Sequence, residues 1–586
     1  MNYNIKNNKG KDILLRYNIK LLILFLAFSV SSCSEEEFLE IEPVDFYSPS
    51  NSYVNAADYE AAVLKLYDRV REDFFSGSLE DSFPNAGIQG TDICYLHKNI
   101  GFNSSMSSLL LPTNDAMVYD PLWRPAYRII FDANVIIGRA NSDENQLTAE
   151  EKAEFTAEAK FFRGYMFKML ANLYGGVPIV LTETNSPKRD YTRASREEVY
   201  QQAANDLKEA ADGLKDVDAA PDHKINKLAA LHILSEVYIS LNRWENAVEA
   251  ASIVIDHGGT ALMTERFGRK KDEKFLIPQY DTDVYWDLFR QGNQNRSAGN
   301  TESIWVLQYE WETPGGYSGQ HGGGPELERL FAPRLWQAKI LNSNGTTSTV
   351  VPNPNAFTGG RSSAFTRPSY FFFETLWQRS GYEEDIRNSS ANIVRDFIVR
   401  NPASDHNGKW IFKDNLPILM SSENDTVRNM YPWITKTSTP GEQPAAAFVV
   451  NPTVEGELSW GHNTFRDVYA IRLAETYLLR AEAYLGMGNQ QLAANDINMV
   501  RNRAKAPLVN ASEVDIDYIL DERARELYLE EFRLLTLTRL GKLVERTRRY
   551  NSHVGNTYDD HNELWPIPFS EIEKNVEAEL LQNPGY

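Results

Sequence analysis

The chain has 586 residues, of which 42% are hydrophobic and 12% aromatic, and its formal net charge is -21. This length and composition exclude an intrinsically disordered chain and are typical of a globular protein with a large core. The acidic balance also argues against a nucleic-acid-binding protein, because contacts to phosphates need a basic surface.

The first 32 residues have the pattern of an export signal. Basic residues up to Lys20 precede an apolar run, 21–28, that is too short to span a bilayer. Small residues then lead directly to Cys33, an arrangement that resembles the lipobox of bacterial lipoproteins. The resemblance implies that Cys33 carries lipid and becomes the first mature residue, which leaves Cys94 without a disulfide partner. The alternative is an ordinary secretory signal in which Cys33 is incidental.

The segment after Cys33 is acidic, with five glutamates between positions 35 and 42. In physical terms it is a solvated tether. In Bacteroidetes lipoproteins a similar run accompanies display on the cell surface, so this resemblance implies an outer-membrane protein, anchored by its lipid and exposed to the outside.

Helical periodicity dominates residues 56–257. Two of the helices open with capping boxes, at Thr148 and at Ser195. Asn134 falls within an apolar helical stripe, and we interpret it as a hydrogen-bonded core residue rather than a ligand. Residues 76–118 are polar and contain glycine, which predicts an exposed excursion from the helical scaffold.

A helical hairpin occurs twice in the sequence. The interval from tyrosine to alanine is nine residues in both copies, from Tyr238 to Ala247 and from Tyr484 to Ala493. The spacing of small and aromatic residues matches the tetratricopeptide pattern. In the second copy the apolar face of the first helix is expected to start at Ile471. Because the copies lie far apart, a long insertion must separate two parts of one helical domain.

The insertion, residues 258–465, differs in character from the helices around it. It holds eight of the eleven tryptophans among glycine, proline, asparagine and serine. The apolar run 304–309 is a candidate strand, in which Trp305 is expected to be core. We therefore predict a loop-rich second lobe, followed after the second hairpin by a charged helix or pair of helices at 519–547.

Several motifs, taken in order, resemble those of the SusD/RagB family, the surface lipoproteins of Bacteroidetes that partner TonB-dependent transporters. They are Cys33, 123–134, 157–163, 174–178, 472–475, 480–484, 498–504, 522–523 with 526–527, Glu530 and Arg533, and the ending 582–586. Each motif alone is weak, but together they span nearly the whole chain.

The resemblance implies a mainly α fold: a tetratricopeptide-like scaffold of helical hairpins interrupted by a large, loop-rich, ligand-binding insertion. The expected domains are a signal peptide at 1–32, a lipidated tether at 33–55, the first scaffold part at 56–257, the insertion at 258–465 and the second scaffold part at 466–586. It also implies a SusC-like transporter as partner and capture of an oligosaccharide without chemical change. For RagB-like members the ligand is a peptide or glycopeptide.

The sequence contains no complete active-site motif. The nine histidines include no HExxH and no pair at helical spacing, and Gly316–Gln320 has glutamine where a nucleophile elbow needs glycine. We expect no enzyme, no cofactor and no metal. A glycoside hydrolase is kept as an alternative, because two carboxylates can meet in space without any signature in sequence. The charged residues of the scaffold motifs, such as Glu522 and Glu526, are interpreted as ion pairs.

Aromatic and polar residues on loops are the candidate ligand contacts. A sugar ring stacks its C–H face on an aromatic ring while its hydroxyls need polar neighbours. Two stretches fit, and the predicted glycan-binding residues are Asp92, Tyr95 and Asn99 in the first, and Trp311 and Tyr317 in the second. The alternatives are that these aromatics pack onto the lobe or meet the transporter, and that the protein is a structural subunit that only gates it.

Overall fold

The computed structural model describes residues 52–76, 86–96, 105–143, 145–277, 279–312, 324–355, 360–419, 428–449, 453, 456–458 and 464–586. The predicted lipid attachment at Cys33 and two predicted ligand contacts, Asn99 and Tyr317, lie outside these ranges. Within them, no helix combines the length and the apolar character that crossing a membrane requires.

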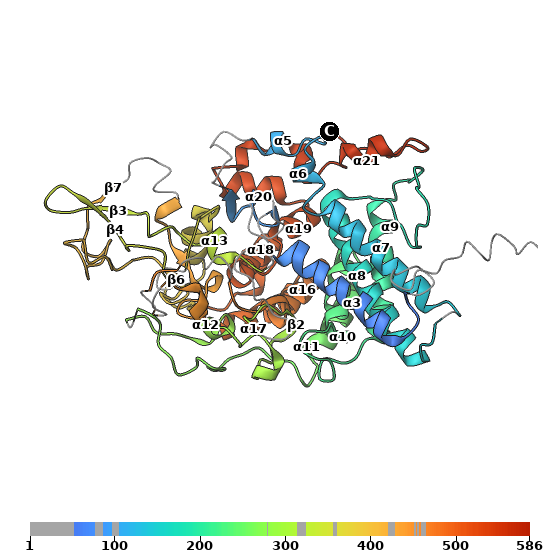
Figure 1. The fold of residues 1–586 in the computed structure, drawn as a ribbon, viewed down its shortest axis with the longest axis horizontal. Helices are drawn as coiled ribbons and strands as arrows, with labels where there is room; N and C mark the ends of the chain where they lie inside the picture. Colours follow the sequence, from blue (N-terminus) through green and yellow to red (C-terminus); the bar gives the residue numbers. More distant parts are fainter. Residues whose placement is uncertain are drawn as a thin grey trace, which may run out of the picture.

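Helices packed on their neighbours form most of the molecule, which confirms the predicted mainly α fold (Figure 1). The first group is α3 Ala56–Val70, α7 Trp123–Ala140, α8 Ala149–Tyr174, α9 Arg196–Gly213, α10 Lys227–Ser240 and α11 Trp244–Ile255. The second group is α16 Leu473–Gly486, α17 Gln490–Arg503, α18 Ile516–Leu527, α19 Arg533–Arg539, α20 Leu543–Tyr550 and α21 Phe569–Lys574. Helix α8 packs against α7 and α9, and α10 packs against α9 and α11.

The helix starts follow the predicted capping boxes. The Thr148 hydroxyl accepts a hydrogen bond from the Glu151 amide at 3.2 Å, and the Glu151 carboxylate accepts one from the Thr148 amide at 2.8 Å. Ser195 and Glu198 make the same reciprocal pair at the start of α9. Each box satisfies amides that the first helical turn leaves without partners.

The two copies of the repeated hairpin lie against one another. Helices α10 and α11 form the first copy, α16 and α17 form the second, and α11 packs on α16. Contact is close at Gly486, where an added Cβ would lie 2.5 Å from the Trp244 ring. One expectation is wrong: Ile471 belongs to strand β9, Val468–Arg472, rather than to α16. Pairing with β2 satisfies the backbone of this segment, so the helix begins only at Leu473.

The lobe carries only short elements in its described residues. Its strand β2 Ser303–Leu307 pairs antiparallel with β9 of the scaffold, and its other strands are β3 Lys339–Leu341, β4 Thr347–Thr349, β5 Thr366–Pro368, β6 Ile393–Val394, β7 Ile418–Leu419 and β8 Trp433–Ile434. Strand β1 Cys94–Leu96 lies outside the lobe in sequence and pairs with β5. Short helices include α12 Val284–Leu288, α13 Leu327–Phe331 and α14 Leu376–Gln378, with α5 Met106–Leu109 and α6 Asp115–Val118 near α7 in sequence. In Figure 1, β3, β4 and β7 lie at the end opposite α7 to α10.

Most of the described tryptophans of the lobe are buried, either within the lobe or against the helices. Trp305 is 1% exposed and packs edge-on against Phe161 of α8, with ring centroids 5.4 Å apart, as a core residue should. Trp286, Trp377 and Trp433 are also buried. Tryptophan content in this lobe therefore reports mostly on packing rather than on ligand contacts.

Two further expectations are wrong. The segment 76–118 is not an exposed excursion throughout, because residues 86–95 are buried and β1 pairs with β5. The C-terminal charged region holds three helices, α18, α19 and α20, rather than one or two. A left-handed backbone conformation at Leu529, with a φ of 59°, lies in the turn that separates α18 from α19.

Candidate functional site

Trp311 lies just past the end of strand β2, close to the start of β9. In the antiparallel register Leu307 pairs with Val468, so the chain leaving β2 runs beside the residues that enter β9. The Trp311 ring meets the Phe465 ring edge-on, with centroids 5.2 Å apart. Trp311 is partly buried and packs against a small apolar cluster of Ala447, Leu458 and Phe465.

The backbone before Trp311 is held by a buried carboxylate. One oxygen of Asp467 accepts hydrogen bonds from the amides of Tyr309 at 2.6 Å and Glu310 at 3.1 Å, while the other accepts one from the Asn295 side chain at 2.8 Å. Burial raises the pKa of the Asp467 carboxyl, and these donors offset part of that shift. The backbone that precedes the indole is thus held in one conformation, which lowers the entropy cost of binding a ligand against the ring.

A groove lies beside the same segment of chain. It has a volume of about 450 Å³, and Leu307 and Gln308 line it together with Asp68 of α3 and Arg71, which directly follows that helix. His223 also reaches it, and burial together with the charge of Lys224 lowers the pKa of this imidazole. The lining combines apolar residues such as Leu307 with polar ones such as Gln308, as in sites for small polar ligands.

The placement of Asp92 contradicts its predicted exposure. Its carboxylate is fully buried and accepts hydrogen bonds from Arg533 at 3.0 and 2.7 Å and from Arg546 at 2.9 Å. Burial opposes ionisation, but the two guanidiniums outweigh it and lower the pKa of Asp92 to about 2. Asp92 is therefore an ionised structural residue that joins β1 to helices α19 and α20.

Tyr95 is also less accessible than predicted. It is 3% exposed, and its ring stacks on His553 with centroids 4.1 Å apart. Strand β1, which carries Tyr95, pairs with β5, and the neighbouring Cys94 is buried as well. Among the described residues from the two predicted stretches, Trp311 is the predicted contact that keeps an accessible surface.

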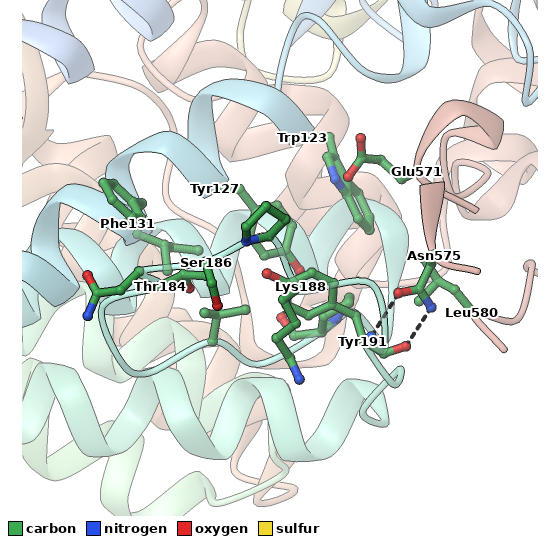
Figure 2. A pocket seen from close by; sticks show the side chains of 15 residues that line it. Trp123, Tyr127, Phe131, Thr184, Ser186, Lys188, Tyr191, Glu571, Asn575 and Leu580 are labelled. Atoms are coloured by element: carbon green, nitrogen blue, oxygen red, sulfur yellow. Dashed lines mark hydrogen bonds between the residues drawn. The ribbon is translucent and has the colours of Figure 1, made fainter. Parts of the chain in front are cut away.

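Sequence patterns missed a second groove on the helical scaffold (Figure 2). It has a volume of about 580 Å³ and lies between α7, the loop 178–191 and the C-terminal residues from α21 to Leu580. Its lining comes from three segments that are distant in sequence. The apolar stripe of α7 that contains Trp123 and Tyr127 was predicted, but nothing in the spacing indicated that part of it lines a groove.

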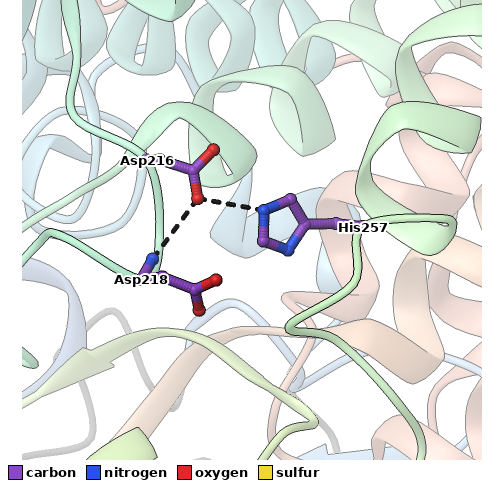
Figure 3. Close-up of side chains that lie close together, drawn as sticks. All are labelled: Asp216, Asp218 and His257. Carbon is purple, nitrogen blue, oxygen red and sulfur yellow. Dashed lines mark hydrogen bonds and ion pairs between the residues drawn. The ribbon is translucent and has the colours of Figure 1, made fainter.

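One cluster has the residue types of a metal site. Atoms of Asp216, Asp218 and His257 lie within 4.8 Å of one another (Figure 3). His257 contacts Asp216 through Nε2 at 3.0 Å and accepts the Gly259 amide on Nδ1 at 3.0 Å, while Asp218 pairs with Arg296 at 2.7 Å. Both imidazole nitrogens are therefore engaged, and the contacts account for the cluster without an ion.

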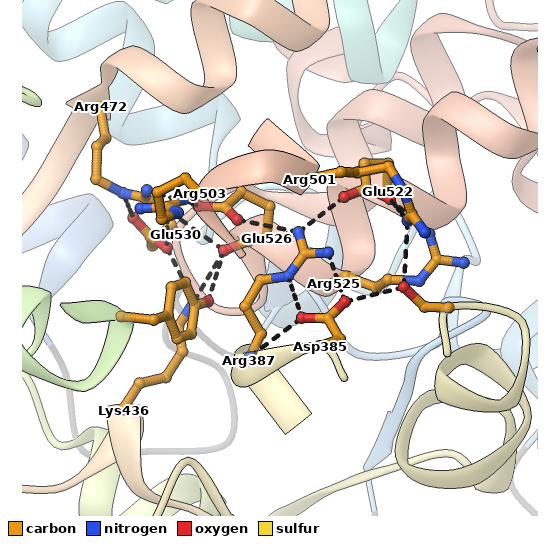
Figure 4. A network of polar contacts seen from close by, with 12 residues as sticks. Asp385, Arg387, Lys436, Arg472, Arg501, Arg503, Glu522, Arg525, Glu526 and Glu530 are labelled. Atoms are coloured by element: carbon orange, nitrogen blue, oxygen red, sulfur yellow. Dashed lines mark hydrogen bonds and ion pairs between the residues drawn. The ribbon is translucent and has the colours of Figure 1, made fainter. Parts of the chain in front are cut away.

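The charged residues of the scaffold form a buried ion network (Figure 4). Glu522 accepts hydrogen bonds from Arg387 and Arg501 at 2.8 Å each and from Arg525 at 2.7 Å. Burial would raise the pKa of Glu522, but the three guanidiniums lower it to about 2. Glu526 is held in the same way by Arg387, Arg472 and Arg503. The interpretation as ion pairs is confirmed, because these carboxylates are ionised, saturated with donors and inaccessible.

Two family models match the chain. Residues 399–586 match the model described as the SusD family, and residues 92–239 match one described as starch-binding associating with outer membrane. The first match covers the second repeat copy and the part of the ion network that lies on helices α16 to α18, but not Arg387. The second covers β1, α7 to α9 and most of α10.

Relatives and solved structures agree with these models. The SusD-like protein P25 of Formosa agariphila is 24% identical over 97% of this chain and 99% of its own length. The starch-binding protein SusD of Bacteroides thetaiotaomicron is 36% identical over 20% of this chain and 22% of its own. The surface glycan-binding protein A of Bacteroides thetaiotaomicron, solved in complex with laminarihexaose, has a similar fold, with a TM-score of 0.62, 18% identity and coverage of 90% of this chain and 100% of that one.

Proposed function

Because the chain belongs to the SusD/RagB family, we propose that it is a cell-surface protein that captures an oligosaccharide and passes it to a SusC-like TonB-dependent transporter. The description of one matching model as starch-binding associating with outer membrane supports both the ligand class and the location. The complex of a similarly folded protein with laminarihexaose supports a glucan among the ligands to be tested.

The observation that carries this proposal is that the ring and the preceding backbone of Trp311 are held in place. Phe465 holds the indole edge-on, and Asp467 holds the backbone of the two residues before it. A ring fixed in this way offers a stacking surface for a sugar. The groove lined by Leu307 and Gln308, earlier in the same segment of chain, offers polar side chains as hydrogen-bonding partners for hydroxyls. Tyr317, in the same predicted stretch, remains a second proposed contact.

The proposed anchor is the lipid on Cys33. Each buried methylene contributes about 0.8 kcal/mol, and two acyl chains are enough for stable attachment to a membrane. The acidic tether 34–55 would then connect the anchor to α3 and leave the folded part outside the bilayer.

Isothermal titration tests the binding function. The lipid-free protein is titrated with a glycan panel that includes laminarihexaose, and Trp311→Ala is compared with Trp410→Ala as the matched control. Trp410 is also a partly buried tryptophan of the lobe, with Lys413 4.1 Å from its ring centroid. We expect Trp311→Ala to weaken binding at least about tenfold, as for a central aromatic contact, and Trp410→Ala to leave it unchanged.

Other outcomes would identify the alternatives. Affinity for peptides instead of glycans favours the RagB-like function, and steady turnover of a glycan favours a glycoside hydrolase. Copurification with the transporter without any measurable ligand affinity favours a purely structural subunit. Equal binding by wild type and Trp311→Ala would refute the assigned site.

A further inference from the structure

The groove on the helical scaffold is a separate structure from the site at Trp311. None of its lining residues is shared with the groove at Gln308. In Figure 2, Trp123, Tyr127 and Phe131 project from α7 on one side, and Thr184, Ser186 and Lys188 come from the facing loop. Glu571, Asn575 and Leu580 close the end formed by the C-terminal segment. Its volume of about 580 Å³ falls within the range of small-molecule sites, roughly 300–1,000 Å³.

The walls of this groove are tied together by hydrogen bonds. The Asn575 side chain accepts from the Tyr191 amide and donates to the Tyr191 carbonyl, both at 2.8 Å. The Tyr127 hydroxyl donates to the Pro178 carbonyl at 2.7 Å. Before the loop, Gly176 permits a close crossing, because an added Cβ would lie 2.1 Å from the Ala194 carbonyl oxygen. The loop is therefore held open at a fixed distance from α7, and the groove is preformed.

Three polar side chains of the loop wall make no side-chain hydrogen bond within the described residues. Thr184, Asn185 and Ser186 are consecutive, line the groove and make no side-chain hydrogen bond to the described part of the chain. The opposite side is aromatic: Tyr127 is partly exposed and Phe131 is exposed, whereas Trp123 and Ile130 are buried and offer little accessible surface. Hydroxyl and amide groups facing an aromatic surface match a ligand that has apolar faces and many hydroxyl groups.

The charges in the lining are already neutralised. Lys188 pairs with Asp190 at 2.5 Å, and Glu571 pairs with Lys574 at 2.9 Å. A charged ligand would have to compete with these pairs. A neutral ligand meets no unpaired charge, so the lining favours an uncharged one.

We propose that this groove is a second carbohydrate-binding site, which takes a short neutral oligosaccharide independently of Trp311. The inference rests on the proposed function, since it assigns the same ligand class to a second surface. Phe131 lines the groove and is 44% exposed, which would also suit an apolar polypeptide segment. The experiment therefore has to distinguish such a segment from a glycan.

The experiment uses the lipid-free protein with Trp311→Ala, so that the first site is disabled. Binding of laminarihexaose, maltohexaose and cellohexaose is measured by saturation-transfer NMR and by titration. Ser186→Trp is then added to fill the groove from an exposed loop position, and Ser343→Trp, at an exposed turn next to β3, is the matched control.

We expect Trp311→Ala to keep saturable glycan binding, and the double variant with Ser343→Trp to bind equally well. In the double variant with Ser186→Trp, we expect the affinity of this residual binding to fall at least tenfold. Loss of all glycan binding in Trp311→Ala alone would overturn the second site while leaving the proposed function intact. Residual binding that survives Ser186→Trp would place the second site elsewhere and also refute the inference. Competition by an apolar peptide, with no glycan binding at the groove, would identify a protein-docking surface instead.

Discussion

Replacing Asp92 by asparagine separates a structural role of this residue from a ligand-binding one. The substitution keeps the size of the side chain but removes the charge that faces Arg533 and Arg546. Removing one partner of a buried ion pair costs about 3–5 kcal/mol, and the lower value is expected here because both arginines keep another carboxylate, Glu531 or Asp521. With an unfolding entropy of about 2.1 cal/mol/K per residue, a loss of about 3 kcal/mol lowers the Tm by roughly 2–3 °C.

The pH dependence follows from the same carboxylate. Its pKa is about 2 in the folded protein and 3.8 as the reference, so its ionisation contributes about 2 kcal/mol above pH 4. Because the folded pKa is the lower one, this contribution is lost as the pH falls toward 2. The stability difference between wild type and Asp92→Asn should therefore shrink by about 1 kcal/mol between pH 7 and pH 3.

The Tm of wild type and Asp92→Asn is measured by differential scanning calorimetry at both pH values, and glycan affinity is measured by titration at pH 7. Asp560→Asn is the control, since Asp560 pairs with Arg548 but its side chain is 88% exposed, and no shift in Tm is expected. An unchanged Tm for Asp92→Asn together with a loss of glycan affinity would refute the structural role and restore Asp92 as a ligand contact.

Two further predictions concern the packing and titration of the core, and both are measured by calorimetry. Burial raises the pKa of Glu328 to about 7. The stability that its neutral form contributes is therefore complete below pH 4.5 and is lost as the pH rises through 7. Glu328→Gln should be about 3 kcal/mol more stable than wild type at pH 8 and equal to it near pH 4. A difference that does not change with pH would contradict this. Gly486→Ala should lower the free energy of unfolding by about 1–3 kcal/mol, because the added Cβ would clash with Trp244 where the two repeat copies touch. The control, Gly138→Ala in α7, has no atom within 4 Å of the added Cβ and should be neutral or slightly stabilising. Equal effects of the two alanines would count against tight packing between α11 and α16.

Much of the helical scaffold could be predicted because its signals are local. The capping boxes at Thr148 and Ser195 act over three residues, and each forms as the spacing indicates. Asn134 was interpreted from its place in an apolar stripe, and its amide donates to the Val180 carbonyl and accepts from Arg163 within the core. The ion network was predicted as a class of interaction, since carboxylates and arginines recur on the same helices.

The errors have one physical origin, which is that burial depends on partners far away in the chain. Asp92 and Tyr95 stand among polar residues and resemble an exposed loop, yet Arg533 lies 441 positions from Asp92 and His553 stacks on Tyr95. Ile471 fits the helical period of α16, but its backbone pairs with strand β2, more than 160 residues earlier in the chain.

The amino-acid sequence alone determined the mainly α class, the two hairpin copies and the family, because periodicity, capping and short motifs are properties of neighbouring residues. Tertiary structure decided which aromatic side chains remain accessible, since Trp311 and Trp305 differ in exposure through packing and not through local pattern. It also created the groove between α7, the loop 178–191 and α21, whose walls come together only because Asn575 binds the backbone of Tyr191 across the fold.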